Sequence, residues 1–274
     1  MLSLGMFTDS FMINAWISGT MVAIICAFVG YFVVVRQSVF AAHALPQVGF
    51  AGGAGAVLWN FNPIYGLLTF SILGAISIGY LSRKEENDVI TALILVAALG
   101  TGALFLGLSD KYAAGAYVLL FGQIVGVSFQ QAIETVVLGS ICILILAFLY
   151  RPLLLTSVSK EIAEAKGVST SFIQMCFLLL LGVVCAITVP VVGALLCFSL
   201  LIAPTAASIY ITSDPKKVML LSLVISLIMM WLSLILAYIS GFPIGFFVSI
   251  IGAFFYAFAR IISFYKLKYK IVRH

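Results

Sequence analysis

Charged side chains are scarce in this sequence. Asp, Glu, Lys and Arg make up 8% of its 274 residues, whereas hydrophobic residues make up 64%. A typical soluble domain has about 25% charged residues, so a soluble fold of this composition could not cover its surface with polar groups. The composition excludes an ordinary soluble domain and predicts one integral membrane domain with short aqueous loops.

Residues that build closed metal sites or catalytic centres are equally few. The five cysteines stand singly in apolar runs, and one of the two histidines is the last residue, His274. A closed zinc site needs clustered Cys or His ligands, so these cysteines are expected to pack as small hydrophobic residues. The sequence lacks HExxH, which argues against an intramembrane protease, and GxxxxGK[ST], which argues against an ATPase activity of its own.

Long apolar runs fill most of the chain. A helix needs about 20 apolar residues to cross the hydrocarbon core, and nine runs approach this length: 11–35, 39–59, 63–81, 89–108, 132–150, 172–189, 191–211, 218–239 and 245–264. The Gly-punctuated stretch 112–128 is expected to form a partial or re-entrant element. Almost no loop separates the sixth run from the seventh, which predicts a tight hairpin or a broken helix around Pro190 and Gly193.

We therefore predict an all-α fold, a polytopic transmembrane helical bundle of eight or nine spans. A single transmembrane domain would occupy residues 1–264, and a basic tail would follow at 265–274. The first apolar run is too long for the hydrophobic region of a signal peptide, so it is expected to remain as a span.

The basic residues predict the orientation. With the N-terminus outside, every basic residue except Lys111 falls at a cytoplasmic end: Arg36, Arg83, Lys84, Arg151, Lys160, Lys166, Lys216, Lys217, Arg260, Lys266, Lys268, Lys270 and Arg273. The opposite orientation would violate the positive-inside rule. We predict a multi-pass protein of a bacterial plasma membrane with its C-terminal tail against anionic headgroups. This distribution accounts for the net charge of +5 without nucleic acid.

The segment 151–171 is a long polar stretch on the predicted cytoplasmic side. It is expected to contain a short surface helix that Ser159 caps and Gly167 ends. We expect Ala163 and Ala165 to be exposed and to let the surface of another protein approach closely. The alternative is an ordinary solvated loop helix with no partner.

Four segments, in this order, resemble the manganese/zinc/iron-type ABC transporter permease family. They are GYFVVVRQS at 30–38, FGQIVGVS at 121–128, the YRPLLLTSVSKEIAEAKGV segment at 150–168 and VGALLCFSLLIAPTAA at 192–207. The resemblance covers essentially the whole chain except the tail. It implies the fold of an ABC importer permease of the metal/vitamin B12 type.

The resemblance also implies partners. Glu161, Ala163, Ala165 and Gly167 would form a coupling helix that sits in a groove of a separate cytoplasmic ATPase, and that subunit would bind the ATP. The chain would work with a second permease copy, as a homodimer, and would receive its cargo from an extracytoplasmic metal-binding protein. It would have no intrinsic cofactor and would not itself be an enzyme.

His43 is the only histidine inside an apolar run. Counted from Arg36 at the cytoplasmic edge, His43 lies about 10 Å and Gln47 about 16 Å into the core, on one helix face. Ionisable residues at such depth often line a pathway, and Pro46 should open the helix locally. We predict that His43 and Gln47 line a metal pathway. The alternative is a histidine that bonds to a neighbouring span or acts as a proton-linked switch.

The sequence departs from the family at this pair. The family segment usually reads S-L-x-G-D-A-L-S-H, and we take His43 and Gln47, which are likewise four residues apart, to stand in place of its Asp and its His. Without the carboxylate a hard cation such as Mn²⁺ loses its preferred oxygen ligand. We therefore expect zinc before manganese or iron, and a chelated metal stays open.

Three other polar residues could line the route: Gln123, Ser199 and Thr205. Such residues more often form hydrogen bonds between helices. The predicted function is an ATP-driven importer permease for a divalent transition metal that works by alternating access. The alternative is a secondary transporter or channel, which would favour more carboxylates within the spans.

Overall fold

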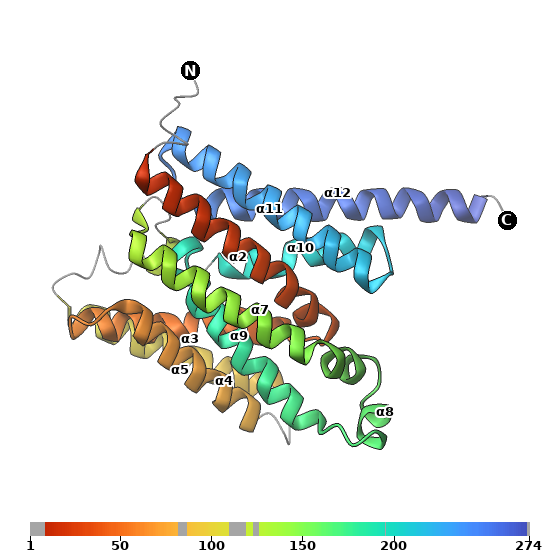
Figure 1. Ribbon diagram of the computed structural model, residues 1–274, viewed down its shortest axis with the longest axis horizontal. Helices are drawn as coiled ribbons and strands as arrows, with labels where there is room; N and C mark the ends of the chain where they lie inside the picture. Colours follow the sequence, from red (N-terminus) through yellow and green to blue (C-terminus); the bar gives the residue numbers. More distant parts are fainter. Residues whose placement is uncertain (1–8, 82–86, 110–118, 123–125, 195, 273–274) are drawn as a thin grey trace.

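The computed structural model describes residues 9–81, 87–109, 119–122, 126–194 and 196–272, with the backbone alone at 87 and 266–272. This part of the chain contains helices and no strands (Figure 1). The helices are α2 (Ser10–Val35), α3 (Val39–Leu58), α4 (Pro63–Leu81), α5 (Asn87–Gly107), α7 (Phe129–Val158), α8 (Lys160–Ala165), α9 (Thr170–Val192), α10 (Cys197–Ile211), α11 (Pro215–Ser240) and α12 (Ile244–Val272).

The predicted all-α transmembrane bundle is confirmed, and each of the nine apolar runs coincides with one helix. Within the described residues, seven helices are long and apolar enough to cross a bilayer. The other two are α3, where His43, Pro46 and Gln47 lower the hydropathy, and α10, which has 15 residues. A helix of that length spans about 22 Å, less than the hydrocarbon core.

The predicted break between the sixth and seventh runs is also confirmed. Helix α9 continues through Pro190 and ends at Gly193, whose φ of 97° is one that residues with a side chain rarely adopt. The segment 119–122 packs on this break, because the Ala194 N–H donates to the Leu119 carbonyl oxygen at 3.0 Å. Most of the predicted partial element 112–128 lies outside the described residues.

Two helices extend past their predicted ends. Helix α7 continues through Pro152 to Val158, and α12 continues into the predicted tail as far as Val272. Within α7, the Thr156 and Ser157 hydroxyls donate to carbonyl oxygens of the preceding turn. Apolar run length predicts how much of a helix is buried in lipid, but it does not predict how far the helix continues into water.

The bundle has two groups of helices joined by α9 (Figure 1). Helix α3 packs against α4 and α5, while α10 packs against α2, α11 and α12. Helix α9 contacts the first group through α4 and α3 and the second through α2, and it also packs against α7. The main core includes buried residues of α2 and α9, such as Phe32, Phe177 and Leu181.

The contact between α3 and α4 depends on small residues. A Cβ atom on Gly52 would lie 2.0 Å from the carbonyl oxygen of Gly66, so the two backbones touch. We expect Gly52→Ala to force the helices apart and to lower the free energy of unfolding by about 1–3 kcal/mol. Gly100→Ala is the control, because nothing lies within 4 Å of that position. Thermal unfolding in detergent would measure both, and equal melting temperatures would contradict the close contact.

Candidate functional site

Helix α3 is enclosed by its neighbours along most of its length, with one opening. Every residue from Ala41 to Ala56 is buried except His43, which is half-buried. Gln47, one turn further along, is only 6% exposed. The imidazole is therefore the single point over this stretch of α3 where a polar side chain reaches open space.

His43 and Gln47 contact each other directly. The Gln47 Nε2 atom lies 3.1 Å from the His43 Nε2 atom, so the amide N–H donates to the ring nitrogen when the proton is on Nδ1. A metal ion at Nε2 would take the place of this donor. Rotation of the Gln47 amide would then present its oxygen to the ion, so the pair can supply one nitrogen and one oxygen ligand.

The pair lies in the first half of its helix. Residues 36–38 form a turn, and α3 begins only at Val39. At the helical rise, His43 lies about 6 Å and Gln47 about 12 Å from the start of α3. The depths of about 10 and 16 Å, which are counted from Arg36 as the cytoplasmic edge of the bilayer, stay predictions. The helix also continues through Pro46, which removes the helical donor for the Ala42 carbonyl oxygen.

An open groove of ≈ 410 Å³ gives access to the imidazole. Its lining is mostly apolar and consists of Gln37, Val39, Phe40, His43, Asp88 and Phe198. The Phe198 ring, on α10, meets the imidazole edge-on at a centroid distance of 5.1 Å. No group of three or more His, Cys, Asp or Glu suited to a metal exists in the described part of the chain. This site can hold an ion in passage, but it lacks the ligands of a closed metal site.

Two of the other predicted lining residues have contacts with other helices, and the third lies outside the described residues. Thr205 is fully buried, and its hydroxyl lies 2.9 Å from the Ser222 hydroxyl of α11. Ser199 lies next to Gly252 of α12. Gln123 lies outside the described residues. For Thr205 the structure provides the interhelical hydrogen bond that was the alternative to a pathway role, and the pathway role of all three stays a prediction.

The predicted surface helix exists as α8, between α7 and α9. The Ser159 hydroxyl accepts the Ile162 N–H at its start, and Gly167 ends the segment with a φ of 76°. Ser159 also donates to the Glu161 carboxylate at 2.8 Å, and this hydrogen bond lowers the pKa of Glu161. The carboxylate thus stays charged in the first turn, where it stabilises the helix dipole.

The exposure of α8 differs from the prediction at one residue. Ala163 is 0% exposed, so the expectation that it lies on the outer surface is wrong for the single chain. A small residue at this position lets α8 lie against the bundle. Ala165 and Gly167 are exposed, as are two apolar residues that sequence reasoning missed: Val158 at 82% and Ile162 at 52%. The signal that could have identified them is that both are apolar residues within the polar stretch 151–171.

Comparison with known proteins identifies similar membrane components. The chain is 26% identical to the manganese transport system membrane protein MntC of Listeria monocytogenes, over 88% of this chain and 86% of the relative. It is also 26% identical to the high-affinity zinc uptake system membrane protein ZnuB of Buchnera aphidicola, over 78% and 82%. Both relatives are aligned over most of their length.

A solved structure shares the fold. The structure described as PsaBC from Streptococcus pneumoniae in complex with Fab aligns with a TM-score of 0.84, covering 93% of this chain and 92% of that chain at 24% identity. A model of the ABC 3 transport family matches residues 8–263, which is nearly the whole chain. The chain therefore belongs to the ABC 3 transport family and is a multi-pass permease of the metal-type ABC transporters.

Proposed function

We propose that this chain is the membrane-spanning subunit of an ATP-driven importer for a divalent transition metal, with zinc the first candidate. The observation that carries the proposal is the His43–Gln47 pair, which combines an imidazole nitrogen and an amide at the one opening of a buried helix. Zinc accepts imidazole readily, whereas manganese prefers carboxylate oxygen. Relatives named for manganese and for zinc support the class of cargo, and iron or a chelated metal belongs to the same class.

The pathway would lie between two copies of the chain. The groove beside His43 opens on the surface of the single chain, and a half-buried imidazole is costly against lipid. A second copy facing this groove would enclose the pair on a twofold axis. With the N-terminus outside, the axis would open outward to an extracytoplasmic metal-binding protein and inward after ATP hydrolysis by a cytoplasmic partner.

The ATPase subunit would bind at α8, so that ATP hydrolysis acts on the membrane domain through this helix. Its exposed apolar side chain Ile162 is suited to contact an ATPase subunit. We expect Ile162→Glu to weaken binding of that subunit by about tenfold or more, because a charge in a desolvated contact has no partner there. Co-purification of permease and ATPase measures the loss. Ser213→Glu, in the exposed link between α10 and α11, is the control, and equal retention of ATPase by both variants would contradict docking at α8.

Transport in proteoliposomes tests the proposed function. The chain would be reconstituted with its ATPase and binding protein, and uptake of radioactive zinc, manganese and iron would be compared. We expect uptake that needs ATP and is insensitive to ionophores, with zinc fastest. A transporter driven by an ion gradient would favour carboxylates deep within its spans. In the described spans the carboxylates are Asp88 at the start of α5 and Glu134 in the second turn of α7, and these positions near helix ends support ATP as the energy source. Uptake that continues without ATP and stops with an ionophore would establish a secondary transporter instead.

A further inference from the structure

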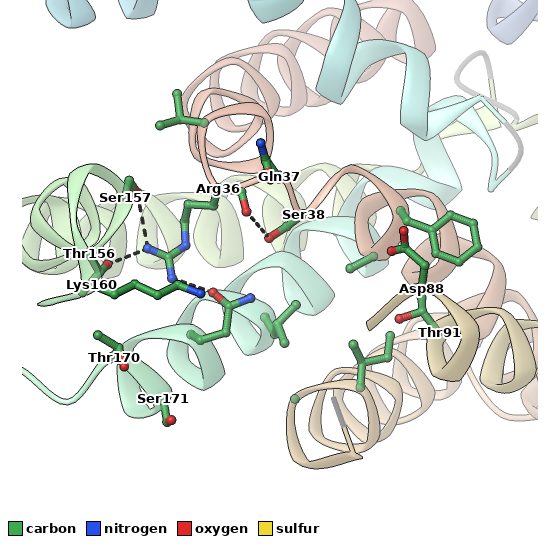
Figure 2. Close-up of a pocket in the computed structure, with 17 residues that line it drawn as sticks. Arg36, Gln37, Ser38, Asp88, Thr91, Thr156, Ser157, Lys160, Thr170 and Ser171 are labelled. Atoms are coloured by element: carbon green, nitrogen blue, oxygen red, sulfur yellow. Dashed lines mark hydrogen bonds between the residues drawn. The ribbon is translucent and has the colours of Figure 1, made fainter. Parts of the chain in front are cut away.

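Arg36 lies at the turn between α2 and α3 and reaches into two other helices (Figure 2). One guanidinium nitrogen donates to the Thr156 hydroxyl at 2.6 Å and lies 3.4 Å from the Ser157 hydroxyl, both at the end of α7. The other donates to the Gln174 amide oxygen, in α9, at 2.5 Å. A single side chain therefore joins three helices through its planar fork.

The guanidinium of Arg36 is hydrogen-bonded to uncharged groups. Among the described residues its hydrogen-bond acceptors are neutral: two hydroxyls, the Leu153 carbonyl oxygen and one amide. The Phe177 ring centroid lies 5.5 Å from the guanidinium carbon. Burial lowers the pKa of Arg36. Positive-inside topology needs only an exposed cation, so it does not account for a guanidinium held this way.

The two helices that Arg36 contacts are those that flank α8. Thr156 and Ser157 come just before α8, and Gln174 comes just after it, near the start of α9. Pro152 leaves the Phe148 carbonyl oxygen without its helical donor, so the last two turns of α7 can bend about this point. The guanidinium of Arg36 therefore contacts the chain on both sides of α8, at the end of α7 and near the start of α9.

The turn that carries Arg36 connects tightly to the helix of the candidate pathway. The Ser38 N–H donates to the Val33 carbonyl oxygen at 2.9 Å, and Gln37 has a left-handed φ of 55°. Helix α3 starts at the next residue, Val39, and carries His43 in its second turn. A displacement of the α7 and α9 ends would therefore move the start of α3.

A cavity beside the fork leaves room for such movement. It has a volume of ≈ 520 Å³ and is lined by Arg36 and by hydroxyl groups, including those of Thr170 and Ser171. Asp88 and Thr91 lie across the cavity from Arg36 (Figure 2). The guanidinium could exchange one neutral acceptor for another as the helices shift, since several are within the same cavity.

We propose that Arg36 is the positioning residue that transmits movement of the α8 segment to α3 and so couples ATP hydrolysis to metal passage. This inference rests on the proposed function. Arg36 would not touch the metal or the ATPase. It would keep the start of α3 fixed to both flanks of α8, so that the two move as one unit.

The test is the number of ATP molecules hydrolysed per metal ion imported by the complete reconstituted complex. We expect Arg36→Gln to lower uptake by about tenfold or more while ATP hydrolysis stays within about twofold, a size typical of coupling between sites. Arg36→Lys keeps the charge but cannot form hydrogen bonds to both α7 and α9 as a planar fork. The number of ATP molecules hydrolysed per metal ion should therefore rise in this variant as well. Arg260→Gln removes an exposed arginine from α12 and should leave the ratio unchanged.

Three results would overturn the inference. The first is an unchanged ratio in Arg36→Gln, including the case in which uptake and hydrolysis fall together with the melting temperature, as expected for a purely structural role. The second is a wild-type ratio in Arg36→Lys, which would make the charge alone sufficient. If Arg36→Gln cannot be purified, Thr156→Val and Gln174→Leu replace it in the test, since each removes an acceptor of Arg36 on one side of α8. The third contradicting result is an unchanged ratio of ATP hydrolysed to metal imported in both of these variants.

These outcomes are separable from failure of the proposed function. If the wild-type complex imports no metal, the proposed function is wrong. If the wild type imports metal and the Arg36 variants keep its ratio of ATP to metal, only the coupling role is wrong.

Discussion

Replacement of His43 by alanine is expected to reduce ATP-driven metal uptake by about 10- to 100-fold, the range typical when a metal site loses a supporting group. The variant should still fold, because His43 is half-buried and, among the described residues, its side chain makes one hydrogen bond, to Gln47, and one ring contact, with Phe198. Loss of transport with normal assembly would therefore be a chemical effect. Uptake of radioactive zinc in proteoliposomes and the melting temperature measure the two quantities.

A matched control separates the imidazole from general damage to the bundle. Ser226 is fully buried, and its hydroxyl donates across the helix interface to the Ala23 carbonyl oxygen at 2.9 Å. Ser226→Ala should cost about 1 kcal/mol of stability and leave uptake unchanged. Wild-type uptake by His43→Ala would remove His43 from the pathway and would leave the alternative of a histidine that bonds only to its neighbours.

The double variant His43→Asp with Gln47→His is expected to change the preferred metal. It introduces a carboxylate and an imidazole four residues apart, which is the spacing of the Asp and the His in the family motif. Because the carboxylate supplies the oxygen ligand that manganese prefers, the ratio of manganese to zinc uptake should rise by about tenfold, equivalent to about 1.4 kcal/mol. Competition between the two metals for uptake by the same vesicles gives this ratio directly.

The single changes test whether the effect comes from the ligands. Gln47→His alone provides two imidazoles and should keep the preference for zinc. His43→Asp alone supplies the carboxylate beside an amide and should lose zinc uptake without the full gain for manganese. A ratio of the two metals that is the same in wild type and double variant would show that selection occurs elsewhere, for example in the binding protein.

The transmembrane fold could be predicted from the sequence because lipid imposes a simple requirement. A helix that crosses the bilayer must be about 20 residues long and apolar, and this requirement locates the nine apolar runs in which the helices lie, while Pro190 and Gly193 mark the break between α9 and α10. The ends of α7 and α12 could not be predicted in the same way. Past the lipid boundary, helix length depends on side-chain hydrogen bonds such as those of Thr156 and Ser157.

The site was only partly predictable. Residue spacing correctly placed His43 and Gln47 on one face, since residues four apart in a helix are neighbours. It did not show the turn at 36–38, which cannot be read from apolar residues alone. It also predicted that Ala163 was exposed, because a short surface helix has no hydrophobic period long enough to show which side faces the protein.

The tertiary contacts of charged residues were the hardest feature to predict from the sequence. In the sequence Arg36 marks only the end of a span, like the other basic residues at that side. Its bonds reach Thr156 and Gln174, more than a hundred residues away. Such long-range neighbours follow from the packing of α2 against α7 and α9, which no local pattern specifies.

The most direct test of the account is a structure of the complete transporter with zinc bound, determined with anomalous scattering at the zinc edge. The proposed metal pathway predicts a zinc peak about 2.0–2.1 Å from the His43 Nε2 atom, with the Gln47 amide turned toward it, on the axis between two copies of the chain. A peak elsewhere in the membrane domain, or an imidazole that faces lipid away from that axis, would contradict it.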